Sequence, residues 1–300
     1  MLGSSAGAVS VDYTATFNKS SSIVSSMAVI RCAENEMITT YVKPPARWEA
    51  MAERTKILVA NPNSSTSMTD ALKPLLVDLA DDRLELEFYT APPTAPNSIN
   101  DAETSAASTA KTLPDLLKFL GLPEDPSTSS PSRYSAILIA CYSAHPLTPL
   151  LRARVSIPVL NIFEASVIRA RALGYPFGIV TTGKYWETAL GEGIVDIPAY
   201  RSGCRDVGAG KGENFVGVRS TGLSAAELHS TAREEVDRRI IQASADLVRE
   251  GAQVVLLGCA GMSGMEEAVL RGARLEDKEV QIVDGVRAGV EILHTWSTLE

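Results

Sequence analysis

The stretch Ala252-Gln-Val-Val-Leu-Leu-Gly-Cys-Ala-Gly-Met262 decides how the rest of the chain is interpreted. A short apolar run that ends in small residues is typical of a buried strand in a parallel sheet. Its cysteine, Cys259, stands directly after the expected strand. Because ligands of open α/β sheets gather at the carboxyl ends of strands, this position favours a functional thiol.

A second stretch repeats the pattern, since Arg133-Tyr-Ser-Ala-Ile-Leu-Ile-Ala-Cys-Tyr-Ser-Ala144 also leads an apolar strand into a cysteine. A buried cysteine is more often a small core residue, and we adopt that interpretation, or simple exposure, for Cys32 and Cys204. The matching contexts of Cys141 and Cys259 predict a catalytic site built from two thiols. The absence of a CxxC pair argues against a metal site. Widely spread cysteines favour a reducing, cytoplasmic location.

The composition limits the classes of partner. The chain has 300 residues, a net charge of −8, 45% hydrophobic and 21% charged residues, which is ordinary for a globular protein long enough for two domains. The excess of acidic over basic residues does not favour binding to nucleic acid or to an anionic membrane surface. No apolar run approaches the ~20 residues that span a bilayer. We therefore expect a small-molecule partner, with no nucleic acid and no membrane.

Residues 1–55 differ from the rest of the chain. They are rich in Ser, Thr and Ala without a hydrophobic period, which predicts a disordered or poorly structured extension. Met51 stands just before the first expected strand and would make a natural start. A mitochondrial presequence is less favoured, because Glu34 and Glu36 interrupt a pattern that should be poor in acids.

Beyond residue 55, short apolar runs alternate with helical patterns, which predicts an α/β fold with mainly parallel sheets. Pro74 should kink or restart its helix, and Pro114 should break the next one. The glycine-rich stretch 201–219 reads as irregular, and Ser224-Ala-Ala-Glu227 fits a capping box that opens one long helix to Glu250.

The two halves carry the same landmarks in the same order. Cys141 follows the strand-end residue Asn61 by 80 positions (141 − 61), and Cys259 follows the strand-end residue Thr181 by 78 (259 − 181). A further strand then ends in Asn161 in one half and in Asp284 in the other. The repetition predicts an internal duplication.

The duplication predicts two similar three-layer lobes related by pseudo-twofold symmetry. We expect the first lobe to hold residues 56–160 plus about 270–300, and the second lobe to hold residues 161–269. The cleft between the lobes would then receive one cysteine from each.

Four motifs carry a resemblance to a known family. They are Ile57-Leu-Val-Ala-Asn-Pro-Asn-Ser-Ser65, Pro158-Val-Leu-Asn-Ile-Phe-Glu-Ala165, Gly178-Ile-Val-Thr-Thr182 and Leu257-Gly-Cys-Ala-Gly-Met262. In this order they resemble the hydantoin/allantoin racemase branch of the aspartate/glutamate racemase superfamily, over about residues 56–293. The resemblance implies a two-lobed, cofactor-free enzyme that assembles into homo-oligomers and uses a thiol on each face of its substrate. The matching positions are Cys141 and Cys259.

The chain departs from that pattern after the first cysteine, where Tyr142-Ser-Ala-His-Pro146 replaces the glycine or threonine that many relatives carry. This affects the expected size and polarity of the substrate more than the chemistry. His145 precedes a proline, which biases it away from helix, and we expect it at the rim of the site.

Two thiols suit racemisation because the proton leaves one face of a carbon and returns on the other. A cysteine pKa near 8.5 keeps both thiol and thiolate accessible near neutral pH. The C5 proton of a hydantoin ring is acidified by its neighbours, so no metal or cofactor is required.

Neutral hydrogen-bonding groups are expected to hold the ring. Asn61, Thr181 and Thr182 lie at strand ends and could bind its amides, while the backbone N–H groups that follow the cysteines, at Tyr142 and Ala260, could face the developing enolate. These neutral groups favour a cyclic ureide over a dicarboxylate.

Three alternatives stay open. The chain could be an amino-acid racemase for aspartate or glutamate, which would need a cationic clamp for the carboxylate. It could be a relative of maleate isomerases or decarboxylases that uses a thiol differently. It could also be a non-catalytic ligand-binding α/β protein.

Overall fold

The computed structural model describes residues 11–13, 28–31, 37–40, 54–122, 132–197 and 214–298. The chain divides into two compact units, Met1–Glu53 and Arg54–Glu300. In the first unit β1 (Val11–Tyr13), β2 (Ala28–Arg31) and β3 (Met37–Thr40) form an antiparallel sheet with β2 in the middle. These strands occupy part of the expected extension, whose dispensability stays a prediction. Cys32 and Cys204 lie outside the described residues.

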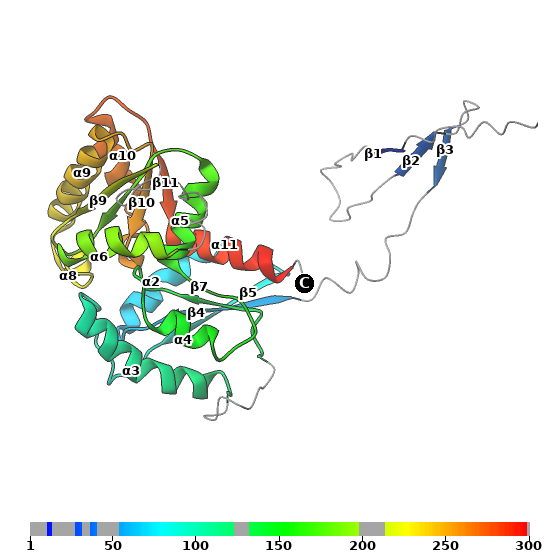
Figure 1. Ribbon diagram of the computed structural model, residues 1–300, viewed down its shortest axis with the longest axis horizontal. Coiled ribbons are helices and arrows are strands. Elements are labelled where there is room, and N and C mark those ends of the chain that lie inside the picture. Colours follow the sequence, from blue (N-terminus) through cyan, green and yellow to red (C-terminus); the bar gives the residue numbers. More distant parts are fainter. Residues whose placement is uncertain are drawn as a thin grey trace, which may run out of the picture. The chain divides into compact units, whose positions relative to one another are not determined.

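The second unit contains two four-stranded parallel sheets (Figure 1). The first sheet has the order β5-β4-β6-β7, from β4 (Thr55–Asn61), β5 (Leu84–Thr90), β6 (Ala136–Ile139) and β7 (Val159–Asn161). The second has the order β11-β10-β8-β9, from β8 (Phe177–Thr181), β9 (Phe215–Ser220), β10 (Val254–Gly258) and β11 (Gln281–Asp284).

The strand order is the same in both sheets, because in each the first strand lies between the second and third and the fourth lies beyond the third. The predicted duplication is thereby confirmed. Cys141 and Cys259 follow the third strand of their sheets, and Asn61 and Thr181 end the first.

Helices cover both faces of each sheet. Alternate residues of the strands point to opposite faces. Leu58 on one face of β4 joins the cluster formed with α3 (Ala102–Phe119) and α4 (Leu147–Arg152). In the second sheet, Val255 of β10 joins the cluster formed with α9 (Arg233–Arg249) and α10 (Glu266–Arg274).

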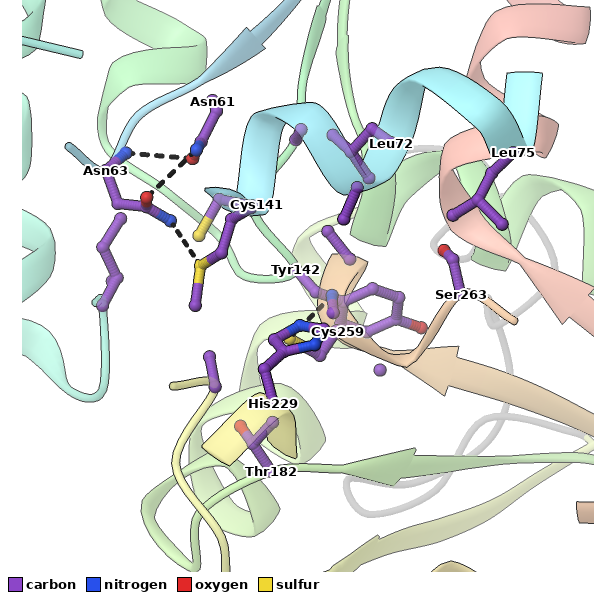
Figure 2. A pocket seen from close by; sticks show the side chains of 18 of the residues that line it. Asn61, Asn63, Leu72, Leu75, Cys141, Tyr142, Thr182, His229, Cys259 and Ser263 are labelled. Carbon is purple, nitrogen blue, oxygen red and sulfur yellow. Dashed lines mark hydrogen bonds between the residues drawn. The ribbon is translucent and has the colours of Figure 1, made fainter. Parts of the chain in front are cut away.

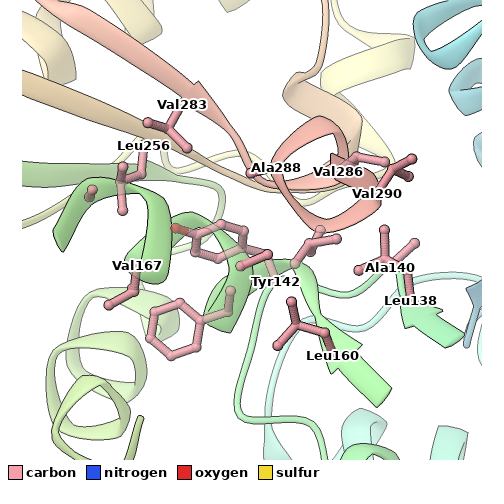
Figure 3. Close-up of a cluster of buried hydrophobic side chains, with 14 of the residues drawn as sticks. Leu138, Ala140, Tyr142, Leu160, Val167, Leu256, Val283, Val286, Ala288 and Val290 are labelled. Carbon is pink, nitrogen blue, oxygen red and sulfur yellow. The ribbon is translucent and has the colours of Figure 1, made fainter. Parts of the chain in front are cut away.

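The opposite faces of the two sheets share one core. This cluster joins Leu138 of the first sheet and Leu256 of the second with α5 (Ile162–Leu173) and α11 (Gly285–Ser297), as Figure 3 shows. The expected three-layer lobes are therefore present, with a common inner helix layer. Within the described ranges, no helix has the length and apolarity that crossing a membrane requires.

Residues 270–300 were predicted to belong to the first lobe, but in the structure they are divided between the two sheets. β11 pairs with β10 in the second sheet, whereas α11 packs on β6 and β4 of the first sheet. The approach is close, because a Cβ on Gly289 would stand 2.4 Å from Cδ1 of Leu138. The remaining lobe boundaries stay a prediction.

Three local predictions were wrong. The helix does not restart at Pro74 or break at Pro114: α2 (Thr66–Leu76) and α3 continue through these prolines, because buried residues on both sides hold each helix against the core. The alternative of a kink at Pro74 stays a prediction. Strand β9 lies in the stretch that was expected to be irregular. The capping box at Ser224 and Glu227 forms, but it opens the short helix α8 (Glu227–Ser230), and α9 begins separately at Arg233.

Candidate active site

One pocket lies where strand ends of both sheets meet, and both predicted cysteines line it (Figure 2). Its volume is about 60 Å³, several times the roughly 10–15 Å³ that one water molecule needs, so it suits a small guest. None of the described residues that line it is Asp, Glu, Lys or Arg. The lining residues are Asn61, Asn63, Met68, Ala71, Leu72, Leu75, Ile99, Ala140, Cys141, Tyr142, Thr182, Trp186, Ala225, His229, Gly258, Cys259, Ala260, Gly261 and Ser263.

The two cysteines reach the pocket from different lobes. Cys141 follows β6 of the first sheet after one intervening residue. Cys259 follows β10 directly and caps the short 3-10 helix η2 (Ala260–Met262). Both are free and half-buried. The parallel third strands of the duplicated lobes therefore deliver one thiol each to the same cavity.

Burial dominates the protonation of both thiols. It raises the pKa of Cys141 to about 12, opposed by the Ser143 hydroxyl and reinforced by the neighbouring Cys259. Sγ of Cys141 lies 3.4 Å from Oγ of Ser143. Burial likewise raises the pKa of Cys259 to about 11, opposed by the Gly261 N–H, which donates to its Sγ at 3.4 Å. Burial therefore favours the thiol form of both residues at neutral pH.

The two threonines at the end of β8 separate. Thr182 lines the pocket, as does Ala260. Thr181 is fully buried and is not among the lining residues; its Oγ1 donates to the Gly258 carbonyl at 3.0 Å and links β8 to β10. Of this pair, only Thr182 is brought to the cavity.

Asn61 lines the pocket, but its side-chain amide is hydrogen-bonded to residues of the turn and helix that follow β4. Its Nδ2 donates to Oδ1 of Asn63 and to Oγ1 of Thr69, each at 3.0 Å. Its Oδ1 accepts the Asn63 N–H at 3.1 Å. Asn61 thereby fixes Asn63, a lining residue that sequence reasoning missed even though it belongs to the same turn.

Tyr142 contributes its ring to the wall, and its hydroxyl pairs with Oγ of Ser166 at 2.7 Å. The prediction that His145 lies at the rim was wrong, because the residue is only 1% exposed. Its Nδ1 accepts the Leu147 N–H at 3.2 Å, and burial lowers the pKa of the imidazole to about 4. His145 is therefore a neutral residue that organises the turn after Cys141.

Two further features escaped sequence reasoning. His229 of α8 lines the pocket on the side of Cys259 (Figure 2). Four residues of α2 at helical spacing form an apolar wall, and they are Met68, Ala71, Leu72 and Leu75. The 3.6-residue period of α2 was readable in the sequence, but nothing in it told which face meets the cavity.

Comparison with known proteins places the chain among related sequences. The Asp/Glu/Hydantoin racemase family model matches residues 57–293. The uncharacterized protein C1F7.10 of Schizosaccharomyces pombe is 36% identical over 239 residues, which cover 79% of this chain and 90% of that protein. Protein DCG1 of Saccharomyces cerevisiae is 27% identical over 248 residues, covering 80% and 96%.

Solved structures share the fold. Allantoin racemase from Pseudomonas fluorescens superposes with a TM-score of 0.65 at 22% identity, covering 82% of this chain and 92% of that one. Allantoin racemase from Klebsiella pneumoniae gives a TM-score of 0.61 at 21% identity, covering 82% and 88%. At these identities the likeness concerns the two-lobed α/β architecture.

Proposed function

The chain belongs to the Asp/Glu/hydantoin racemase family and is an isomerase, and we propose that it racemises five-membered cyclic ureides, 5-substituted hydantoins or allantoin, by proton transfer between two thiols. One observation carries the proposal: Cys141 and Cys259 line a single small pocket whose other described lining residues bear no carboxylate, ammonium or guanidinium group.

The proposed reaction assigns one proton transfer to each face of the ring. A thiolate removes the C5 proton, so that the C–H electron pair moves into the adjacent carbonyl and an enolate forms. The thiol of the other cysteine then returns a proton to the opposite face and becomes the thiolate. The two cysteines exchange roles according to the hand of the substrate.

Residues around the pocket also offer hydrogen-bonding groups that could bind the ring. The backbone N–H groups of Tyr142 and Ala260, next to the cysteines, are suited to the enolate oxygen. Thr182 and Asn63 offer neutral partners for the ring amides. Thr181 is assigned no direct contact, since its hydroxyl is already bonded to Gly258.

The neutral lining favours a ureide over a dicarboxylate. An aspartate or glutamate racemase must hold carboxylates, which calls for Arg, Lys or a comparable charged clamp. Within the described part of the pocket no such side chain is present. We further propose a cytoplasmic homo-oligomer that needs no cofactor.

The test follows optical rotation and isotope content together. Enantiopure allantoin and a series of 5-substituted hydantoins are incubated with the protein in D₂O, beside aspartate and glutamate. We expect loss of optical rotation with one deuterium gained at C5 of the ureides. A protein-free sample at the same pH corrects for spontaneous exchange. If the protein accelerates neither process for any ureide, the proposed substrate class is wrong.

The thiols are tested by single substitution. Cys141→Ser and Cys259→Ser should each lower the racemisation rate by about 100-fold or more, because a hydroxyl is far too weak an acid to replace the thiol. Cys204→Ser is the matched control and should retain the rate. Undiminished turnover in either of the first two variants would remove that cysteine from the mechanism.

A further inference from the structure

The surroundings of the two thiols are unequal, and the difference lies at Cys259. Cys141 has the Ser143 hydroxyl beside it, which is not a base near neutral pH. Next to Cys259 lies the imidazole of His229, contributed by a helix that ends about thirty residues earlier in the chain, as Figure 2 shows.

Gly261 fixes the geometry of this pair. A Cβ on Gly261 would stand 3.0 Å from Nε2 of His229 and 3.6 Å from Sγ of Cys259. The ring nitrogen and the sulfur therefore flank the same point above the η2 turn. A side chain there would crowd His229, so the glycine leaves room for the imidazole next to the thiol.

His229 is held in place by its neighbours in α8. Leu228 is 3% exposed and packs in the same apolar cluster as Met262 of η2, which ties α8 to the turn that carries Cys259. The capping box between Ser224 and Glu227 fixes the start of the helix. The backbone is thus anchored, while His229 is an exposed residue that lines the pocket.

Charged groups on the neighbouring elements have other partners. Glu227 accepts from the Ser224 N–H, Glu266 accepts from the Gly264 N–H, and Arg239 pairs with Glu235. Among the described lining residues, His229 is the one basic side chain beside the thiols.

We propose that His229 is a positioning residue that exchanges a proton with Cys259. The S–H bond of Cys259 breaks, its proton moves to Nε2, and the resulting imidazolium stabilises the thiolate. When Cys259 acts as the acid, the proton returns along the same route to sulfur and then to carbon. Burial raises the pKa of both thiols, so a proton acceptor on one face supplies the thiolate that the reaction needs. This inference deepens the proposed function and rests on it for its role in turnover.

The first test measures thiolate formation without any substrate. Alkylation by iodoacetamide is followed from pH 6 to pH 10 at each cysteine by peptide mass spectrometry, in the wild type, in His229→Gln and in Ser230→Ala on the same helix. In the wild type Cys259 should react at lower pH than Cys141. His229→Gln should slow the reaction of Cys259 at pH 7 by about tenfold or more, while Cys141 and the Ser230→Ala protein are unchanged.

An unchanged rate at Cys141 also shows that His229→Gln is folded. A Cys259 profile in His229→Gln that overlays the wild-type profile overturns the inference. If Cys259 responds to His229 but the wild type racemises no ureide, the proposed function fails and the proton exchange stands, so the two failures are distinguishable.

The second test uses substrates deuterated at C5. The equilibrium constant of a racemisation is one, so kcat/KM must be equal for the two enantiomers in every variant. A difference between the roles of the two cysteines therefore has to be measured as a difference between the isotope effects of the two enantiomers. In His229→Gln the primary isotope effect should rise for the enantiomer deprotonated by Cys259 and fall for the other. Equal changes for both hands, or none, would contradict the assignment.

Discussion

At the scale of single residues, the two sulfur atoms share a cavity but not an environment. Hydroxyl and backbone groups contact them, and burial opposes their ionisation. A cysteine buried in this way is unreactive until a neighbour or a substrate stabilises its charge. Reactivity at these positions therefore reports on the pocket more than on the intrinsic acidity of a thiol.

The pH dependence at Cys141 follows from its raised pKa of about 12. Only the thiolate reacts with alkylating reagents, and its fraction grows about tenfold per pH unit while the pH lies below the pKa. Alkylation of Cys141 should therefore keep rising steeply from pH 8 to pH 11. Peptide-resolved alkylation rates check this, and a plateau near pH 9 would show that burial does not control this thiol.

Thr181 and Thr182 should respond differently to the same substitution. Thr181→Val leaves the Gly258 carbonyl without its 3.0 Å donor and should lower the free energy of unfolding by about 1–3 kcal/mol. Thr182→Val should raise KM by up to about tenfold with little effect on stability, because this residue faces the cavity. Urea unfolding and initial rates measure both variants. If Thr181→Val raised KM and Thr182→Val lowered stability instead, the roles assigned to the two threonines would be wrong.

Sequence reasoning found the strand-end residues but not the direction of every side chain. Thr181 is the last residue of β8 and its hydroxyl bonds to the Gly258 carbonyl, whereas Thr182 lies just beyond the strand and lines the pocket, a difference that the sequence does not show. His229 carried no signal, because its approach to Cys259 depends on how α8 packs against η2. Contacts between distant segments are set by tertiary packing, which no local pattern encodes.

At the scale of elements, seven of the eight strands that the structure describes in the second unit were predicted from apolar or alternating runs. Strand β9 was missed because Gly217 interrupts it, with a φ of 152° and a register shift beside β8. The duplication could have found it, since β9 occupies the position that β5 holds in the first sheet. The break between α8 and α9 was hidden because both segments carry helical residues.

Close packing between β10 and β8 leaves no room for a side chain at Gly258. A Cβ there would stand 2.5 Å from the Val180 carbonyl oxygen, which belongs to the sheet backbone and cannot move aside. Gly258→Ala should lower the free energy of unfolding by about 1–3 kcal/mol.

The matched control for this substitution is Gly191→Ala. Gly191 lies in α6 (Tyr185–Gly193) with open space around its Cα, so alanine should stabilise the protein by about 0.5–1 kcal/mol. Denaturant midpoints decide the outcome. If both variants shifted the midpoint in the same direction, crowding at Gly258 would not be the cause.

At the scale of the whole molecule, the repeated landmarks predicted two lobes and one thiol from each. They could not predict that α5 and α11 form an inner layer common to both sheets, because that layer depends on how the lobes face each other. The shared layer also explains why residues 270–300 do not belong to one lobe: β11 and α11 are consecutive but join different sheets.

A chain that begins at Met51 tests the independence of the second unit. Arg54–Glu300 forms its own compact unit and contains every described lining residue of the pocket. We expect the shortened protein to retain the thermal midpoint and the racemisation rate of the full chain. Loss of cooperative unfolding or of turnover would show that the first 50 residues contribute to the fold.

The position of α11 has a consequence for synthesis. This helix follows every other described element in the sequence, yet it packs on β4 and β6, the first and third strands of the second unit in chain order. Leu138 and the neighbouring apolar side chains lack this cover while residues 140–284 are being translated. The first lobe therefore completes its apolar core only after α11 has been synthesised, and until then the nascent chain exposes apolar side chains that favour aggregation.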